Sequence, residues 1–156
     1  MANEIVITPA APCSVELVQN DVFSLELNLG AVGVSLLPDF DKIFLSRIAD
    51  GDIGGQRIVI GNADGTVSYA DATNVGHLGK VLGMSDAAYL DGETVRVIRE
   101  GLVEFVGWSF DVDLPIYLGI NGLLTQSASA TGFSQIVGFA ESPTKLFVNL
   151  REPILL

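Results

Sequence analysis

The residues of this chain that could take part in catalysis are few and far apart. His77 is the only histidine among 156 residues, and its neighbours supply no cysteine, second histidine or carboxylate at the spacing of a zinc site. A Ser-His-Asp triad would have to use His77, and no Gly-x-Ser-x-Gly turn leads into a helix. Cys13 is the only cysteine, so the chain cannot form an internal disulfide. These residues predict no catalytic site and no cofactor.

Carboxylates offer the remaining chemistry. Three pairs are spaced two residues apart in expected loops, where their oxygens could hold Ca²⁺: Asp39 with Asp41, Asp50 with Asp52, and Asp111 with Asp113. None completes an EF-hand, so no metal site is predicted, and Asp50 with Asp52 are the weak candidates. Asp64-Gly65-Thr66 is interpreted as a hairpin turn rather than as part of an aspartic-protease signature. A hydrolase that uses two carboxylates brought together by the fold stays open.

Charge and composition exclude other classes. The net charge is −11, and the eight basic residues are scattered, which argues against nucleic acid and against an anionic membrane surface as partners. The hydrophobic fraction is 49% while charged residues reach only 17%, so we expect a partner to cover part of an apolar surface. The first residues lack a basic stretch followed by a long apolar one, which argues against a secretory signal and favours synthesis in a cytoplasm.

The elements that must position these residues are mostly strands. Residues 1–21 predict an extended N-terminal arm or connector, because Pro9 and Pro12 interrupt its apolar start. Residues 22–31 alternate between apolar and polar and predict a half-buried strand. Phe40, Ile43, Phe44 and Ile48 recur at helical spacing, which predicts one short helix over residues 39–48. Residues 22–156 are expected to form a single β domain.

The most informative pattern is an internal quasi-repeat, over about residues 56–106 and 114–156. Each copy has an apolar strand, a turn at Asp64-Gly65 or Asn121-Gly122, and a strand that contains Gly83 or Gly138. Asp-Gly and Asn-Gly pairs favour tight hairpin turns, and a glycine within a strand allows a bulge or a close backbone approach. In the sequence match, Ile58 corresponds to Ile116, and the closing segments 99–103 and 151–155 correspond to each other. The predicted fold is mainly β, a small sandwich or barrel of short antiparallel strands whose two related halves cover each other's apolar faces.

This repeated unit resembles the small β-barrel domains of tailed-bacteriophage head-decoration (cement) proteins, which are related to phage fibre attachment domains. The resemblance covers about residues 56–156 and is one of pattern rather than of invariant motifs. It implies a virion structural protein without catalytic residues, which forms homotrimers, binds the major capsid protein and stabilises the phage head. Residues 1–55 lie outside the resemblance, and a capsid-contacting arm is what the family implies for them.

Apolar residues in unusual places are the candidate interface. Alternation puts Trp108 and Phe110 on one side of the segment that links the two halves, where they serve either the core or a subunit interface. The segment Ile154, Leu155 and Leu156 is expected to be covered, here by a neighbouring subunit. The alternative function is a head- or tail-fibre module, or a receptor- or glycan-binding module, that uses Trp108, Tyr69 or Tyr89 as a stacking platform.

Overall fold

The structure is a computed structural model that describes residues 42–156. These residues are mainly β, as predicted from the sequence, and contain only two short 3-10 helices. The predicted arm (1–21), the predicted strand (22–31) and Cys13 lie outside the described residues. The strands are β1 (Ile43–Ala49), β2 (Ile58–Gly61), β3 (Thr66–Tyr69), β4 (Val81–Ser85), β5 (Thr94–Glu104), β6 (Pro115–Leu118), β7 (Leu124–Thr125), β8 (Phe133–Ser134), β9 (Ile136–Ser142), β10 (Lys145–Asn149) and β11 (Ile154–Leu155). The helices are η1 (Val75–His77) and η2 (Ile120–Gly122).

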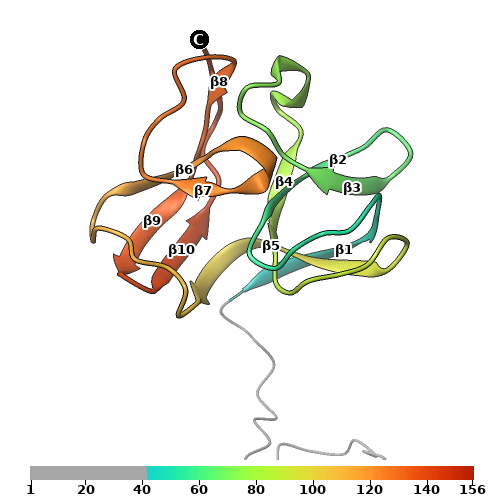
Figure 1. Ribbon diagram of the computed structural model, residues 1–156, viewed down its shortest axis with the longest axis horizontal. Helices are drawn as coiled ribbons and strands as arrows, with labels where there is room; N and C mark the ends of the chain where they lie inside the picture. The colour runs from blue at the N-terminus through green and yellow to red at the C-terminus, as the bar shows by residue number, and fades with distance from the viewer. Residues whose placement is uncertain (1–41) are drawn as a thin grey trace, which may run out of the picture. The chain divides into compact units, whose positions relative to one another are not determined.

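Nine of these strands form one sheet, in the order β1-β3-β2-β4-β5-β10-β9-β6-β7. Strand β1 pairs in parallel with β3 and antiparallel with β5, so the first five strands of this order close into a barrel. The strands β10, β9, β6 and β7 continue the sheet beyond β5 and form the second half (Figure 1). A separate two-stranded sheet joins β8 to β11.

The strand order confirms the predicted quasi-repeat. Outward from the central β5–β10 pair, β4, β2 and β3 follow on one side, and β9, β6 and β7 follow on the other. Both predicted turns are hairpins: β2 pairs with β3 across the turn that contains Asp64-Gly65, and β6 pairs with β7 across the turn that contains Asn121-Gly122. Each half is therefore the same arrangement of four strands, and β1 is the addition that closes the first half.

Two glycines occupy equivalent places in the two halves. Gly83 lies opposite Val59 in the β2–β4 ladder, and Gly138 lies opposite Ile116 in the β6–β9 ladder. A Cβ on Gly83 would stand 2.2 Å from the carbonyl oxygen of Ile98, and one on Gly138 would stand 2.0 Å from that of Phe147. The predicted close backbone approach is confirmed at both glycines.

These ladders correct the details of the sequence match. The residue equivalent to Ile116 is Val59 rather than Ile58, because Val59 lies opposite Gly83 as Ile116 lies opposite Gly138. The strand equivalent to β5 is β10, since Ile98 and Phe147 approach the two glycines in the same way. The match of residues 99–103 with residues 151–155 is therefore wrong, and the second of these segments follows β10 and includes β11.

The predicted short helix over residues 39–48 is wrong within the described residues, which begin at Lys42. Residues 43–49 form β1, which pairs with β5 from Ile43 opposite Glu100 to Ile48 opposite Thr94. Phe44 packs against one core cluster and Leu45 against the other, so both faces of this strand contact apolar groups. Such a strand loses the period of two that identifies a half-buried strand, and its apolar spacing imitates that of a helix.

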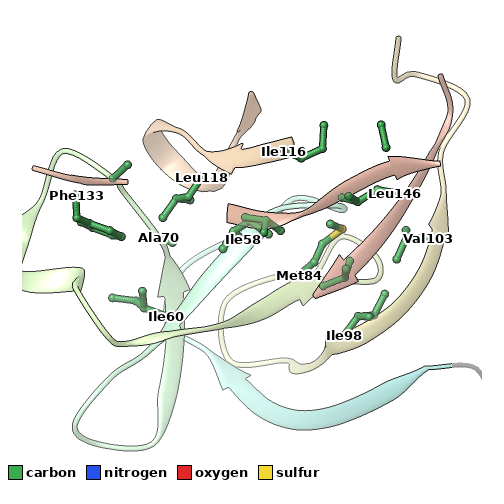
Figure 2. Close-up of a cluster of buried hydrophobic side chains, with 14 residues drawn as sticks. Ile58, Ile60, Ala70, Met84, Ile98, Val103, Ile116, Leu118, Phe133 and Leu146 are labelled. Atoms are coloured by element: carbon green, nitrogen blue, oxygen red, sulfur yellow. The ribbon is translucent and has the colours of Figure 1, made fainter. Parts of the chain in front are cut away.

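Two clusters of buried side chains form the core. The smaller one comes from the strands of the barrel and contains Val59, Val67, Val95 and Val97. The larger one joins the two halves, because Ile58, Met84 and Ile98 of the first half belong to it together with side chains of β6, β9 and β10 (Figure 2). The two halves therefore cover each other's apolar faces, as the sequence predicted.

Candidate functional site

The segment that links the two halves carries three aromatic rings. Trp108 meets Phe105 edge to face, with ring centroids 5.6 Å apart, and lies 5.2 Å from Phe110. Hydrogen bonds hold the segment on the β9–β10 turn, from the Phe105 N–H to the Thr144 carbonyl and from the Phe110 N–H to the Pro143 carbonyl. The backbone of the segment is therefore fixed on this turn at both ends of the aromatic group.

The sequence left open whether Trp108 and Phe110 belong to the core or to a surface, and the structure places them partly in each. Both are half-buried and pack against the larger core cluster. Both also line a cleft of about 310 Å³, together with Phe105, Gly55, Gln56, Arg57, Leu123 and Leu124. Their packing on the core accounts for part of their burial, and their predicted role in a subunit interface stays a prediction.

The other predicted interface residues are exposed. Ile154, Leu155 and Leu156 are 66%, 58% and 57% exposed. Strand β11 pairs with β8, whose Phe133 is fully buried, and the Leu156 N–H donates to the Gly132 carbonyl at 3.1 Å. The segment is thus attached to its own chain while its side chains contact solvent.

The weak metal candidates, Asp50 and Asp52, are part of a hydrogen-bonded loop. Asp50 accepts a bond from the Asn62 amide at 3.2 Å, and Asp52 accepts one from the Asp91 N–H at 3.0 Å. Asp91 in turn accepts one from the Gly51 N–H at 2.8 Å. Over residues 42–156, no three His, Cys, Asp or Glu side chains gather in a way that could hold a metal ion.

His77 takes part in the structure of its loop. Its Nδ1 accepts a hydrogen bond from the Asp71 N–H at 3.0 Å, and its Nε2 lies 3.0 Å from the Asn74 amide. Burial opposes ionisation of Asp71, but hydrogen bonds from the Thr73 hydroxyl and backbone outweigh it and hold the pKa of Asp71 below its ordinary value. Asp64 has the same arrangement, in which bonds from the Thr66 hydroxyl and backbone lower its pKa.

A groove that the sequence did not predict contains two of the proposed stacking residues. Tyr69 of β3 and Tyr89 line it with Ile53, Leu90 and two carboxylates, Asp52 and Glu93, and its volume is about 500 Å³. We name this the tyrosine groove. The sequence identified the tyrosines, but the carboxylates come from separate loops and carry no shared motif.

The tyrosine groove has fixed walls. The Tyr69 hydroxyl accepts a bond from the Gly54 N–H at 2.7 Å, and the Tyr89 hydroxyl donates to Asp86. Burial, and then this bond to Asp86, raise the pKa of Tyr89. Glu93 accepts a bond from the Leu90 N–H at 2.7 Å. Asp52 and Glu93 each keep one oxygen without a hydrogen bond in the part of the chain that the structure describes, so each can accept one from a ligand.

Comparisons with known proteins identify no family: no family model matches the chain, and no curated protein matches its sequence. None of the helices formed by residues 42–156 has the length and apolar character needed to cross a membrane.

Proposed function

We propose that this chain is a structural protein of a tailed-phage particle, a capsid decoration protein that assembles with copies of itself, as a homotrimer, and binds the major capsid protein on the head. The protein is made in the host cytoplasm and its final location is the virion. The proposal includes no catalytic step, no cofactor and no contact with nucleic acid or membrane.

The exposed apolar segment of β11 is the observation that carries this proposal. Ile154 and Leu155 are more than half exposed, although they belong to a strand that is hydrogen-bonded to the chain. Exposed apolar groups on a fixed strand favour a surface that a partner covers, because water around them costs free energy. Decoration proteins need such surfaces toward sister subunits and toward the shell.

The repeated architecture also supports the proposal. Two similar four-stranded halves share the larger core cluster, and each half contains one small hairpin. The resemblance to head-decoration domains rests on the same strand-turn-strand pattern, and the strand order follows that pattern over most of residues 56–156.

Binding to assembled particles tests the proposal. The full chain is mixed with phage heads that lack a decoration protein and, separately, with unassembled capsid subunits, and co-sedimentation is measured. We expect saturable binding to heads and none to free subunits, since a decoration protein recognises neighbouring capsid subunits together. The heads are assembled from the major capsid protein whose gene lies beside the gene for this chain. If the chain does not bind these heads, the proposal is refuted.

The tyrosine groove favours a second candidate, a glycan- or receptor-binding module of a fibre. Aromatic rings that stack on sugar faces and carboxylates that accept hydroxyl hydrogens are a combination that suits neutral sugars. A glycan array screened with the full chain tests it, with Glu93→Gln as the groove variant and Glu141→Gln as a matched control outside the groove. Binding that the first variant removes and the second keeps would favour this candidate, and an array without signal would exclude it for the glycans tested.

A further inference from the structure

The outer face of the second half carries an uncovered apolar row. Phe147 of β10 lies directly opposite Leu102 of β5 on one side and Phe139 of β9 on the other, and Phe139 lies opposite Pro115 of β6. Residues opposite each other in a ladder point to the same face, so these four side chains form one continuous line across four strands. We name it the aromatic row.

The row interrupts the expected pattern of the sheet. Along β10, Leu146 and Val148 are fully buried, whereas Phe147 between them is 40% exposed, and Phe139 is 39% exposed. An antiparallel sheet with one face on the core normally carries polar residues on its other face. Phenylalanines in register at such outward positions favour a face that is covered in the assembled protein.

The first half shows what happens to the equivalent row. Met84 follows Gly83 as Phe139 follows Gly138, and Met84 lies opposite Ile58 and Ile98. These three residues are at most 2% exposed, because the second half of the chain packs on them. Nothing in the part of the chain that the structure describes does the same for the aromatic row.

The chain's own β11 is not free to cover the row. It is paired with β8, and the Arg151 N–H before it donates to the Ile136 carbonyl at 3.0 Å. Its Ile154 and Leu155 are nevertheless exposed, so each chain presents two unlike apolar surfaces, one across four strands of the large sheet and one on a strand of the two-stranded sheet. A closed ring of three copies requires two different surfaces on each copy, one that meets the preceding copy and one that meets the next.

We propose that the aromatic row of one copy is covered by β11 of the next copy, so that Ile154 and Leu155 pack on Phe139 and Phe147 around the ring. This inference rests on the proposed function, because it assumes that copies of the chain assemble. It assigns the interface to a face that the sequence did not mark, since Phe139 and Phe147 resemble ordinary strand residues until their exposure is known.

Sedimentation velocity on the full chain tests the contact. The row variant carries Phe139→Thr and Phe147→Thr, the edge variant carries Ile154→Thr and Leu155→Thr, and Val106→Thr is the control, because Val106 is 88% exposed and lies outside both surfaces. Threonine keeps the strand propensity. We expect the control to assemble like the wild type. In each interface variant, the dissociation constant should rise at least about 10-fold for each aromatic or branched side chain removed.

An equimolar mixture of the two variants distinguishes this contact from other arrangements. The row variant keeps an intact β11 and the edge variant keeps an intact row, so the mixture should form a pair with one intact contact, although neither variant assembles alone. If the row variant assembles like the wild type, or if the edge variant does so while the row variant does not, the proposed contact is wrong.

Two further outcomes keep the tests separate. If the row variant shows no thermal unfolding transition, it has not folded. The single variant Phe147→Thr then takes its place, because it removes only one of the two aromatic rings. A wild-type chain that is monomeric at every concentration overturns both the contact and the proposed homotrimer, whereas the proposed binding to the capsid is judged separately by co-sedimentation with phage heads.

Discussion

Gly138→Ala should destabilise the protein far more than an alanine at most other positions. An ideal Cβ at Gly138 would stand 2.0 Å from the Phe147 carbonyl oxygen and 2.9 Å from Leu146 Cδ1. Real Cβ atoms essentially never come within 3.0 Å of a non-bonded heavy atom, so the new Cβ and the Phe147 carbonyl oxygen must move apart by about 1.0 Å, and β9 must shift relative to β10. The obstacle is the backbone of the neighbouring strand, which cannot rotate away.

The magnitude follows from that displacement. A ladder hydrogen bond of about 2.9 Å becomes about 3.9 Å long when the strands separate by 1 Å, which is too long to count as a bond. Each lost bond that leaves a buried polar group unsatisfied costs about 1–3 kcal/mol. Because Gly138 and Val148 are opposite each other in the ladder and Val148 is fully buried, packing is lost as well. We expect a loss of about 3–5 kcal/mol, a large part of the stability of a typical domain.

Gly65→Ala is the matched control. Gly65 has φ of +87° in the β2–β3 turn and no atom within 4 Å of its ideal Cβ, so only the backbone conformation resists the change. We expect a loss of about 1–2 kcal/mol there. Urea unfolding followed by circular dichroism measures both variants against the wild type. A Gly138→Ala protein that loses no more stability than Gly65→Ala would refute the close approach of β9 and β10.

Three further predictions address other parts of the molecule. Trp108→Ala should lower the free energy of unfolding by about 2 kcal/mol in urea titrations, because the half-buried indole packs on the shared core, and a change within about 0.5 kcal/mol would contradict that packing. Asp64→Ala should lower the melting temperature at neutral pH but not in strong acid: the lowered pKa means that the ionised carboxylate stabilises the folded state above its unfolded pKa, and this contribution disappears as pH falls through the folded pKa. An equal effect at both pH values would contradict the assigned bonds. In an alkaline absorbance titration, Tyr89→Phe should remove an ionisation step above about pH 10, because burial and the bond to Asp86 raise the pKa of Tyr89, and a variant that lacks an earlier step instead would contradict this.

The sequence by itself determined the features that depend on neighbouring residues. The turn at Asp64-Gly65 and the turn at Asn121-Gly122 were predicted because a short loop requires backbone conformations that these residues adopt at low cost. The close approaches at Gly83 and Gly138 were predicted because a strand tolerates such contact only where a Cβ is missing. The β class and the two related halves followed from the same local signals, repeated along the chain.

Only the tertiary structure decided which faces are covered. Residues 43–48 form a strand rather than a helix because β5 pairs with them, and this pairing joins segments about fifty residues apart. Met84 and Phe139 are equivalent positions, but Met84 is buried because the second half packs on it, whereas Phe139 is exposed because no described segment covers the outer face of the second half. The tyrosine groove likewise joins loops that no motif connects. A residue's chemistry is local, but its accessibility depends on segments that are distant in sequence, and for this reason the candidate surfaces appear only in the folded chain.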